Sequence, residues 1–520
     1  MASDPLISTE YWTDVQITPQ DIEFLHTHLF EHEVPLTARE LVSVFVNERV
    51  RAEKLAVQQR RQAGGKKYLP RESYQPGDDV LFPTLDWKHG KVTAVRAGTN
   101  PDMGTFDVLT VDMDGGSERL FASNLAIHTL NDEPVTVEEN EFDVDAILHD
   151  HDSLLEKKIE SAFFAEDEIV RIAGRWFPRA LLIDVNVGHL NLAEAVMDMA
   201  GGEPLPTDAL LKDVSLPEGV NPKLAEFSLN FALQEDARFD EVGPAGQVLW
   251  CLRRLEPAEV RDVPMYLEYS LIEHDRSLLT PQMLNLESHL DDELSEITTA
   301  SDKEVREVTI SLIFPHLRAG TLPLSARIRP LFPTAYESPR VRFTLVDGKT
   351  KQKMPGWVVR EHGYVFGLGN WYKANDLIPG SLVKIQRGEN PGEVIIEAKP
   401  YRAKDWVRTV IVGTDGGLVF AMLKQSLSAE INERMSFAIP SVEAVEQLWL
   451  QNKRSFEKLV ADMIREMSKL TPQGHVHAQE LFSAVNIVRR VPPAPLFALL
   501  ASRPEFIHVG DMHFRLGETE

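Results

Sequence analysis

The sequence predicts a multi-domain α+β protein built from small β-barrels and from helical units that each close with a β-hairpin. Three observations lead to this fold class. The chain has 520 residues, which is too long for one core and corresponds to roughly three to five domains. Its hydrophobic content of 43% and charged content of 26% are ordinary globular values. Stretches with helical spacing of apolar residues alternate with runs of short strands separated by glycine and proline turns.

Residues 1–70 are expected to form a helical region with a basic end. Thr18 and Pro19 have the pattern of an N-cap followed by proline at the first helical position. Thr37 and Glu40 have capping-box spacing, in which the threonine oxygen and the glutamate each satisfy an unpaired amide. The sequence therefore predicts two helices between residue 18 and about residue 62.

In residues 74–130 the spacing of apolar residues changes from a helical pattern to the pattern of short strands, with turns at positions such as Gly77 and Gly90. Four or five strands in about 50 residues must curl into a small barrel to bury one face. The run from Pro76 to Val80 and the later Gly90-Lys91-Val92 resemble the opening of SH3-like, KOW-type or Tudor-type barrels. Residues 131–165 follow as an expected acidic linker, because nine acids and no Lys or Arg lie between Asp132 and Asp152.

Residues 166–260 predict three helices followed by a hairpin around the turn Gly243–Gly246. This order is the winged-helix plan, a variant of the helix-turn-helix. An acidic connecting segment is expected at 261–307. The C-terminal residues 441–520 repeat the plan of three helices and a hairpin. On Val476–Phe482 and on the closing strands from Phe506 to Leu516, this end resembles HARE-type winged helices, a family that includes a domain of the RNA polymerase delta subunit.

Residues 308–408 are expected to form a basic β-barrel, followed by a hairpin and connector at 409–440. Strand-like phrases run from Gly356 to Arg360 and from Tyr364 to Phe366, before a short segment that contains Trp371. Together with the following strand around Val383, this string resembles the B3-type DNA-binding pseudobarrel. Trp357 and Trp371 are expected in the core. The resemblance implies that exposed strand and loop residues would enter the major groove.

Several function classes find no support in the composition. The one cysteine, Cys251, lies in an apolar run, so we expect a buried, inert thiol and no cysteine-rich zinc site. No apolar stretch approaches the roughly 20 residues of a membrane span, and the N-terminus lacks a secretory pattern, so the cytoplasm is the default expectation and no membrane partner is expected.

Catalytic motifs are also not recognisable, and we expect no enzyme activity, no cofactor and no metal site. The stretch His149-Asp150-His151-Asp152 has ligand-type residues, but they are adjacent in the acidic segment, where a linker is the favoured interpretation. Residues 112–116 lack the third acidic position and the closing glutamate of a calcium loop, so a hairpin turn is expected. No P-loop, Gly-x-Ser-x-Gly or His-Glu-x-x-His motif occurs.

Charge is distributed unevenly along the chain. The formal net charge is -26, yet residues 49–71 carry eight basic residues against one acid, and residues 318–408 carry 16 against eight, which leaves -41 for the rest. Lys and Arg neutralise phosphates and release counterions, so both basic segments are candidates for nucleic-acid contact. The candidate residues are Arg49, Arg51, Lys54, Arg60, Arg61, Lys66, Lys67, Arg71, Lys91 and Arg96, and, in the second segment, Arg340, Arg342, Lys349, Lys351, Lys353, Arg360 and Lys373.

The predicted winged helices are poor candidates for reading DNA. A reading winged helix places Arg, Lys, Asn or Gln on its third helix. The helix at 221–236 has Lys223 but also three acids, and residues 493–501 carry no charge. Both units are therefore interpreted as protein-interaction or packing units.

These observations favour a non-enzymatic nucleic-acid-binding protein associated with transcription or chromosomes, with DNA favoured over RNA. Its basic segments would contact phosphates, and its winged helices or acidic segments would hold a protein partner. The alternative is an acidic protein-interaction scaffold or regulator that does not bind nucleic acid. An enzyme acting on nucleic acid has the least support.

Overall fold

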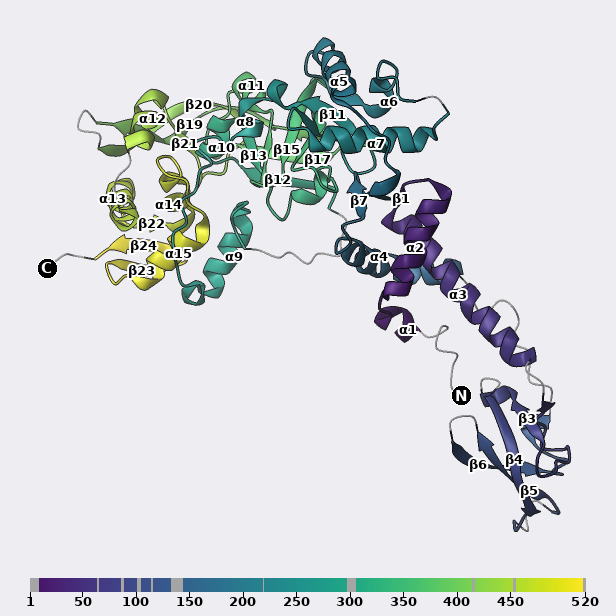
Figure 1. Ribbon diagram of the computed structural model, residues 1–520. Helices are drawn as coiled ribbons and strands as arrows, with labels where there is room; N and C mark the ends of the chain where they lie inside the picture. Colours follow the sequence, from purple (N-terminus) through teal and green to yellow (C-terminus); the bar gives the residue numbers. More distant parts are fainter. Residues whose placement is uncertain are drawn as a thin grey trace. The chain divides into compact units, whose positions relative to one another are not determined.

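The structure, a computed structural model, describes residues 9–62, 65–85, 88–100, 104–113, 116–131, 144–217, 219–296, 305–413, 417–451 and 455–517. The side chains at 9, 10, 53, 56–58 and 60–62 are not described. The predicted multi-domain α+β class is confirmed (Figure 1). The chain divides into two compact units, residues 1–183 with 220–227 and residues 184–219 with 228–520.

The first unit has a helical core. It contains α1 (Thr9–Asp14), α2 (Pro19–His32), α3 (Ala38–Gln62) and α4 (Val144–Phe163), with the three-stranded sheet of β1 (Leu36–Thr37), β8 (Arg175–Pro178) and β7 (Ile169–Ile172). Both predicted helix starts are confirmed. The Asp21 amide donates to Thr18 Oγ1, and the Thr37 amide donates 2.7 Å to Glu40 Oε2 while the Glu40 amide donates back to Thr37 Oγ1.

The predicted acidic linker is wrong for residues 144–163, which form α4. Leu155, Ile159 and Phe163 repeat every four residues on one face of α4, and all three are fully buried against α3 and its neighbours. Burial of three large apolar side chains, each worth about 1.5–3 kcal/mol, outweighs the acidic character of the opposite face. Residues 132–143 of the predicted linker lie outside the described residues.

A five-stranded sheet completes the first unit. Its order is β2 (Lys66–Lys67), β3 (Asp79–Phe82), β4 (Lys88–Ala97), β5 (Asp107–Met113) and β6 (Ser117–Ser123). Val80, Phe82, Val92 and Leu109 form its core with Tyr68. The strands predicted at 74–125 are confirmed, whereas the SH3-like, KOW-type identity of this sheet stays a prediction.

The second unit begins with the helices and hairpin of the predicted domain 166–260, whose residues 166–183 belong instead to the first unit as β7 and β8. They are α5 (Val187–Met199), β9 (Leu205–Pro206), α6 (Thr207–Leu210), α7 (Pro222–Glu235, whose residues to Phe227 belong to the first unit), β10 (Phe239–Glu241) and β11 (Leu249–Leu252). Asn230 Oδ1 accepts buried hydrogen bonds from Thr207 Oγ1 at 2.6 Å and from Trp250 Nε1 at 2.8 Å. Cys251 is buried as predicted, and burial raises the pKa of its thiol to about 12.

A seven-stranded sheet forms the centre of the second unit, in the order β12-β17-β18-β14-β15-β16-β13. The strands are β12 (Glu307–Ser311), β13 (Thr321–Pro323), β14 (Arg340–Asp347), β15 (Lys353–Val359), β16 (Tyr364–Phe366), β17 (Leu382–Arg387) and β18 (Glu393–Glu397), with helices α10 (Phe314–Ala319) and α11 (Gly369–Ala374) between them. β14 and β18 pair in parallel, and the other strand pairs of the sheet are antiparallel. Trp357 and Trp371 are each 4% exposed, which confirms both as core residues.

The predicted boundary between residues 408 and 409 falls inside a strand and is wrong. A long hairpin of β19 (Pro400–Val412) and β20 (Leu418–Ala429) starts nine positions earlier than expected and is joined by β21 (Phe437–Ala438). Its strands pair continuously from Ala403 with Leu427 to Val412 with Leu418. The basic residues around position 404 therefore lie on this hairpin.

The C-terminal residues form the three predicted helices and the hairpin, with one further helix, α12 (Val442–Gln451), before them. The other elements are α13 (Phe456–Ser468), β22 (Val476–His477), α14 (Ala478–Val485), α15 (Pro493–Ser502), β23 (Phe506–Gly510) and β24 (His513–Leu516). Helix α15 is buried along most of its length, with Phe497 fully inaccessible, and it packs on α9 (Pro281–Leu290).

The segment predicted as an acidic connection at 261–307 is therefore partly wrong, because it contains α9 as well as the end of the short helix α8 (Ala258–Arg261). Thr280 and Pro281 supply the N-cap and first helical position of α9. Among the described residues, no helix has both the length and the apolar character needed to span a membrane.

Candidate nucleic-acid interface

Most described basic side chains of residues 49–71 are paired with carboxylates inside the first unit. Arg49 lies 2.6 Å from Asp21, Arg51 2.8 Å from Glu48, Lys66 2.9 Å from Asp78 and Arg71 3.6 Å from Glu72. Lys54 and Lys67 are exposed, and Lys54 also has an interaction within the chain. The side chains of Arg60 and Arg61 lie outside the described residues. This segment therefore carries less uncompensated charge than the sequence suggests.

Lys91 and Arg96 are exposed on β4, as expected for a surface patch. Lys91, however, stands in register with Asp79 of β3 on one side and with Asp112 of β5 on the other. Directly opposed residues in antiparallel strands have Cβ atoms about 5 Å apart, so two carboxylates offset this ammonium group. The local field at Lys91 is not strongly positive.

The prediction that Arg340 contacts nucleic acid is wrong, because its side chain is not available to a phosphate. Its side chain is buried and lies 3.2 Å from both Asp240 and Glu256, which come from the preceding helix-and-hairpin unit. Arg342 is also largely enclosed. Its Nη1 donates 2.6 Å to the Phe343 carbonyl, and its guanidinium lies over the Trp357 ring. Both arginines attach neighbouring segments within the second unit, because a buried guanidinium needs a partner for its charge.

The turn between β14 and β15 presents three of the predicted lysines. Asp347 closes this turn by accepting the amides of Lys349 at 2.7 Å and Thr350 at 3.0 Å. Lys349 and Lys351 are exposed within it, and Lys353 follows at the start of β15, where it pairs with Glu393 at 2.6 Å. Burial would raise the pKa of the Asp347 carboxyl, but the hydrogen bonds it accepts outweigh that effect and lower it.

Helix α11 carries a fourth predicted lysine and is attached to this turn. The Trp371 indole Nε1 donates 2.9 Å to Asp347 Oδ2, so α11 is attached to the turn, and Lys373 is exposed two residues further on. Arg360 is not part of this group. It lies at the far end of β15, about 23 Å along the strand from Lys353, and donates to the Ser338 carbonyl at 2.7 Å.

The hairpin β19–β20 contributes residues that the sequence-based prediction missed. Trp406 is 58% exposed and pairs in register with Lys424, whose ammonium lies 5.7 Å from the centre of the indole ring. Lys404 pairs with Ser426 two positions further along. Residues two apart in a strand share a face, so Lys404, Trp406 and Lys424 stand together. The only signal in the sequence was the aromatic and basic alternation of residues 401–406.

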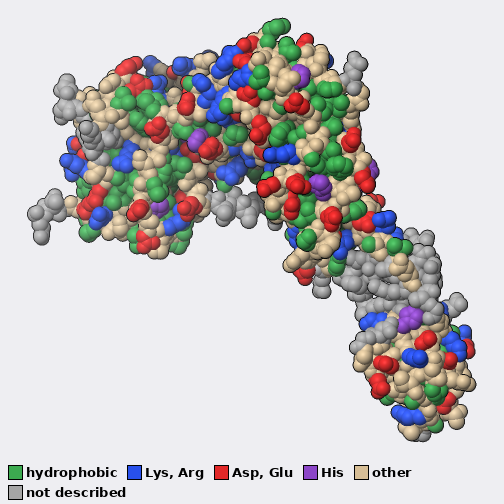
Figure 2. All heavy atoms as spheres, viewed as in Figure 1, with side chains coloured by type: hydrophobic (Ala, Val, Ile, Leu, Met, Phe, Trp, Pro, Cys, Tyr) green, Lys and Arg blue, Asp and Glu red, His purple; other side chains and the backbone are tan. Residues whose placement is uncertain are grey.

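One contact connects this hairpin face with α11. Ser428 of β20, on the same face as Lys424, donates 3.2 Å to Asp376, which lies just after α11. We call the resulting surface the basic face, defined as Lys349, Lys351, Lys373, Lys404, Trp406 and Lys424. In Figure 2, Lys and Arg side chains gather in the region where Figure 1 labels α11 and β20.

The lysines of the basic face have no carboxylate partner within the described part of the chain, in contrast to Lys353. Two acids on these segments are engaged in hydrogen bonds, because Asp347 holds the turn and Asp376 accepts from Ser428. Five exposed ammonium groups without a carboxylate partner attract polyanions, and two of them, Lys404 and Lys424, share a strand face with an exposed indole.

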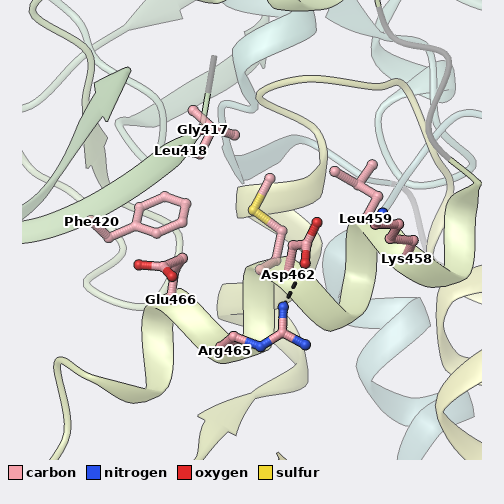
Figure 3. Close-up of a pocket in the computed structure, with 9 residues that line it drawn as sticks. Gly417, Leu418, Phe420, Lys458, Leu459, Asp462, Arg465 and Glu466 are labelled. Carbon is pink, nitrogen blue, oxygen red and sulfur yellow. Dashed lines mark hydrogen bonds and ion pairs between the residues drawn. The ribbon is translucent and has the colours of Figure 1, made fainter. Parts of the chain in front are cut away.

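Other features of the chain offer less chemistry. A pocket of about 330 Å³ lies between β20 and α13 (Figure 3), but the Arg465 and Asp462 side chains on its wall pair with each other at 2.6 Å. His149–Asp152 lie on α4 instead of in a linker, where His151 is buried and Asp152 pairs with Arg39 at 2.8 Å. Among the described residues, no group of three or more His, Cys, Asp or Glu side chains is arranged to hold a metal ion.

Comparison with known proteins gave no match to a family model, to a curated protein or to a solved structure. The resemblances to HARE-type winged helices, SH3-like barrels and the B3-type pseudobarrel therefore remain predictions.

Proposed function

We propose that this protein is a non-enzymatic nucleic-acid-binding protein, associated with transcription or with chromosomes, that contacts phosphates through the basic face. The single observation that carries this proposal is the set of five exposed lysines without a carboxylate partner in the described chain. Such groups give sequence-independent affinity, because each phosphate contact releases condensed counterions. The exposed side chains Arg51, Lys54 and Lys67 of the first unit are candidates for additional contacts.

Burial of α15 supports a packing role for the C-terminal unit in place of base reading. A recognition helix must enter the major groove with polar side chains. Helix α15 instead buries Phe497, Leu496 and Leu500 against the rest of the second unit. A protein partner held by the helix-and-hairpin units or by the acidic segments remains part of the proposal.

A competing function, the acidic interaction scaffold, is motivated by the net charge of -26. The two functions are separated by titrating labelled duplex and single-stranded DNA with the full chain and following fluorescence anisotropy. If all five lysines contact phosphates, the slope of log affinity against log salt is about -4.5 for duplex and about -3.5 for a single strand. The scaffold predicts no binding at low salt.

A charge-reversed variant locates the binding surface. The variant K349E/K351E/K373E removes three of the five contacts, so the duplex slope falls to about -2 and binding weakens at every salt concentration. The matched control K157E/K212E/K458E changes the net charge equally at exposed lysines outside the basic face. Equal losses in both variants would mean that total charge, and not this surface, governs binding.

A further inference from the structure

Trp406 is an exposed tryptophan on the first strand of the hairpin β19–β20. The other tryptophans with described side chains are at most partly exposed, and Trp12, Trp176 and Trp250 are at most 1% exposed. Trp406 leaves 58% of its surface in solvent, although burying an aromatic ring is a large source of stability. An exposed aromatic ring beside basic side chains offers a face on which a base can stack.

The surroundings of Trp406 determine which kind of partner fits. Lys424 lies over the ring, and Lys404 stands two residues away on the same face, about 6.6 Å along the strand. Asp405, the acidic neighbour in sequence, belongs to the opposite face, and its carboxylate accepts the Trp406 amide at 2.7 Å. A flat apolar ring with one ammonium group over it and a second lysine on the same strand face matches a ligand with flat rings and regularly spaced negative charges.

We infer that Trp406 stacks on an unpaired base, so that the basic face holds single-stranded nucleic acid in preference to duplex. This inference rests on the proposed function, because the lysines must first bind the phosphates. In a duplex the faces of the bases are covered by their neighbours, whereas in a single strand each base can present a face to an aromatic side chain. Lys404 and Lys424 then contact the phosphates on either side of the stacked base.

The hairpin is well suited to hold the indole in place. Trp406 lies inside a run of paired residues, from Ala403 with Leu427 to Val412 with Leu418. Val407 and Leu427, on the face of the hairpin opposite Trp406, are buried and anchor the hairpin in the hydrophobic core. A ring carried by a paired strand loses little additional freedom on stacking, which favours affinity.

The test compares W406A, W406F and the control L423A on one labelled oligonucleotide, single-stranded and as its duplex. Leu423 is 42% exposed on the opposite face of the same hairpin. We expect W406A to bind the single strand about tenfold more weakly, within the range for one stacked base, with duplex affinity unchanged. W406F should restore most of the loss, L423A should behave as the unaltered chain, and thermal unfolding should show that all variants fold.

A spectroscopic measurement tests stacking independently of affinity. Binding of unlabelled single strand should quench part of the tryptophan fluorescence of the unaltered chain, and W406F should lack that part. If W406A binds both forms as the unaltered chain does, or loses both equally, the stacking inference is overturned while the proposed function stands. If the unaltered chain binds neither form, the proposed function fails as well, so the two failures are distinguishable.

Discussion

The Trp371 indole donates a hydrogen bond of 2.9 Å to Asp347, and this bond attaches helix α11 to the turn between β14 and β15. The same carboxylate accepts the amides of Lys349 and Thr350. One buried acid therefore sets the geometry of two lysine-bearing segments. Asp347 is thus shared between the turn that carries Lys349 and Lys351 and the helix that carries Lys373.

Replacing Asp347 with alanine should destabilise the second unit and weaken nucleic-acid binding together. The substitution leaves the buried Trp371 N–H without an acceptor, which costs about 1–3 kcal/mol, and it loosens the lysine-bearing turn. Urea unfolding and anisotropy titration measure the two effects. The pKa of Asp347 in the folded protein is lowered, so ionised Asp347 stabilises the fold. This stabilisation is present at pH values above the ordinary pKa of Asp and is lost as the pH falls through the pKa of the folded protein. Unchanged affinity in D347A would mean that the turn does not position the lysines.

The junction between β10 and the segment before β14 should weaken as the pH rises. Burial raises the pKa of Glu241 to about 7, although Ser338 and the Gly243 amide donate to it, and nearby Glu337 raises it further. Since the folded pKa exceeds the ordinary 4.5, this stability is fully present below 4.5 and is lost as the pH rises through about 7.

The variant E241Q should remove the part of the pH dependence of the unfolding free energy that comes from Glu241. Gln keeps the acceptor for Gly243 and stays neutral, so at pH 8 the variant should be more stable than the unaltered chain, on the order of 2 kcal/mol. Burial and the neighbouring Asp240 also raise the pKa of Glu256 to about 7, so some pH dependence should remain. Urea unfolding at pH 5 and pH 8 measures the difference, and an identical pH response in E241Q would contradict this assignment.

Arg490 should be essential for the folding of the second unit. Its buried guanidinium lies 2.6 Å from Asp292 and 2.8 Å from Glu293, and Glu293 in turn lies 3.1 Å from His316. Although burial opposes ionisation, Arg490 and His316 hold the pKa of Glu293 well below its usual range. R490M leaves the buried Asp292 without its cationic partner and Glu293 with His316 alone, and should cost about 3–5 kcal/mol. The variant R490M/D292N/E293Q should recover most of that stability in urea unfolding, and R490M as stable as the unaltered chain would refute the role of this network.

Helix α15 should matter for stability and not for nucleic-acid binding. Phe497 is fully buried, so F497A should lower the free energy of unfolding by about 3–5 kcal/mol. Arg503, at the end of α15, is exposed and pairs with Glu457 at 3.2 Å. R503A should change stability by at most about 1 kcal/mol and leave DNA affinity unchanged. A clear loss of DNA affinity in R503A would indicate that this end of α15 contacts DNA.

The sequence predicted structural features well where the interactions that determine them involve residues close together in the chain. The Thr37–Glu40 capping box and the burial of Trp357 and Trp371 are confirmed. Helix α4 was missed because acidic composition was given more weight than the spacing of Leu155, Ile159 and Phe163, which was visible in the sequence.

The site was less predictable, because charge and aromatic character do not reveal what covers a side chain. Arg340 and Lys349 belong to the same basic segment, yet Arg340 meets Asp240 and Glu256 from about 100 positions away in the sequence. Likewise Trp371 is buried and Trp406 is exposed, although both lie among basic residues. Such differences depend on contacts distant in the sequence.

Photochemical crosslinking tests the central claim most directly. A single-stranded oligonucleotide with photoreactive thymines is bound to the unaltered full chain, irradiated and digested, and the crosslinked peptides are identified by mass spectrometry. We predict crosslinks to the peptides that contain Trp406, Lys424 and the turn Lys349–Lys351. Crosslinks confined to residues outside the basic face, or none under binding conditions, would contradict the proposal that this surface holds nucleic acid.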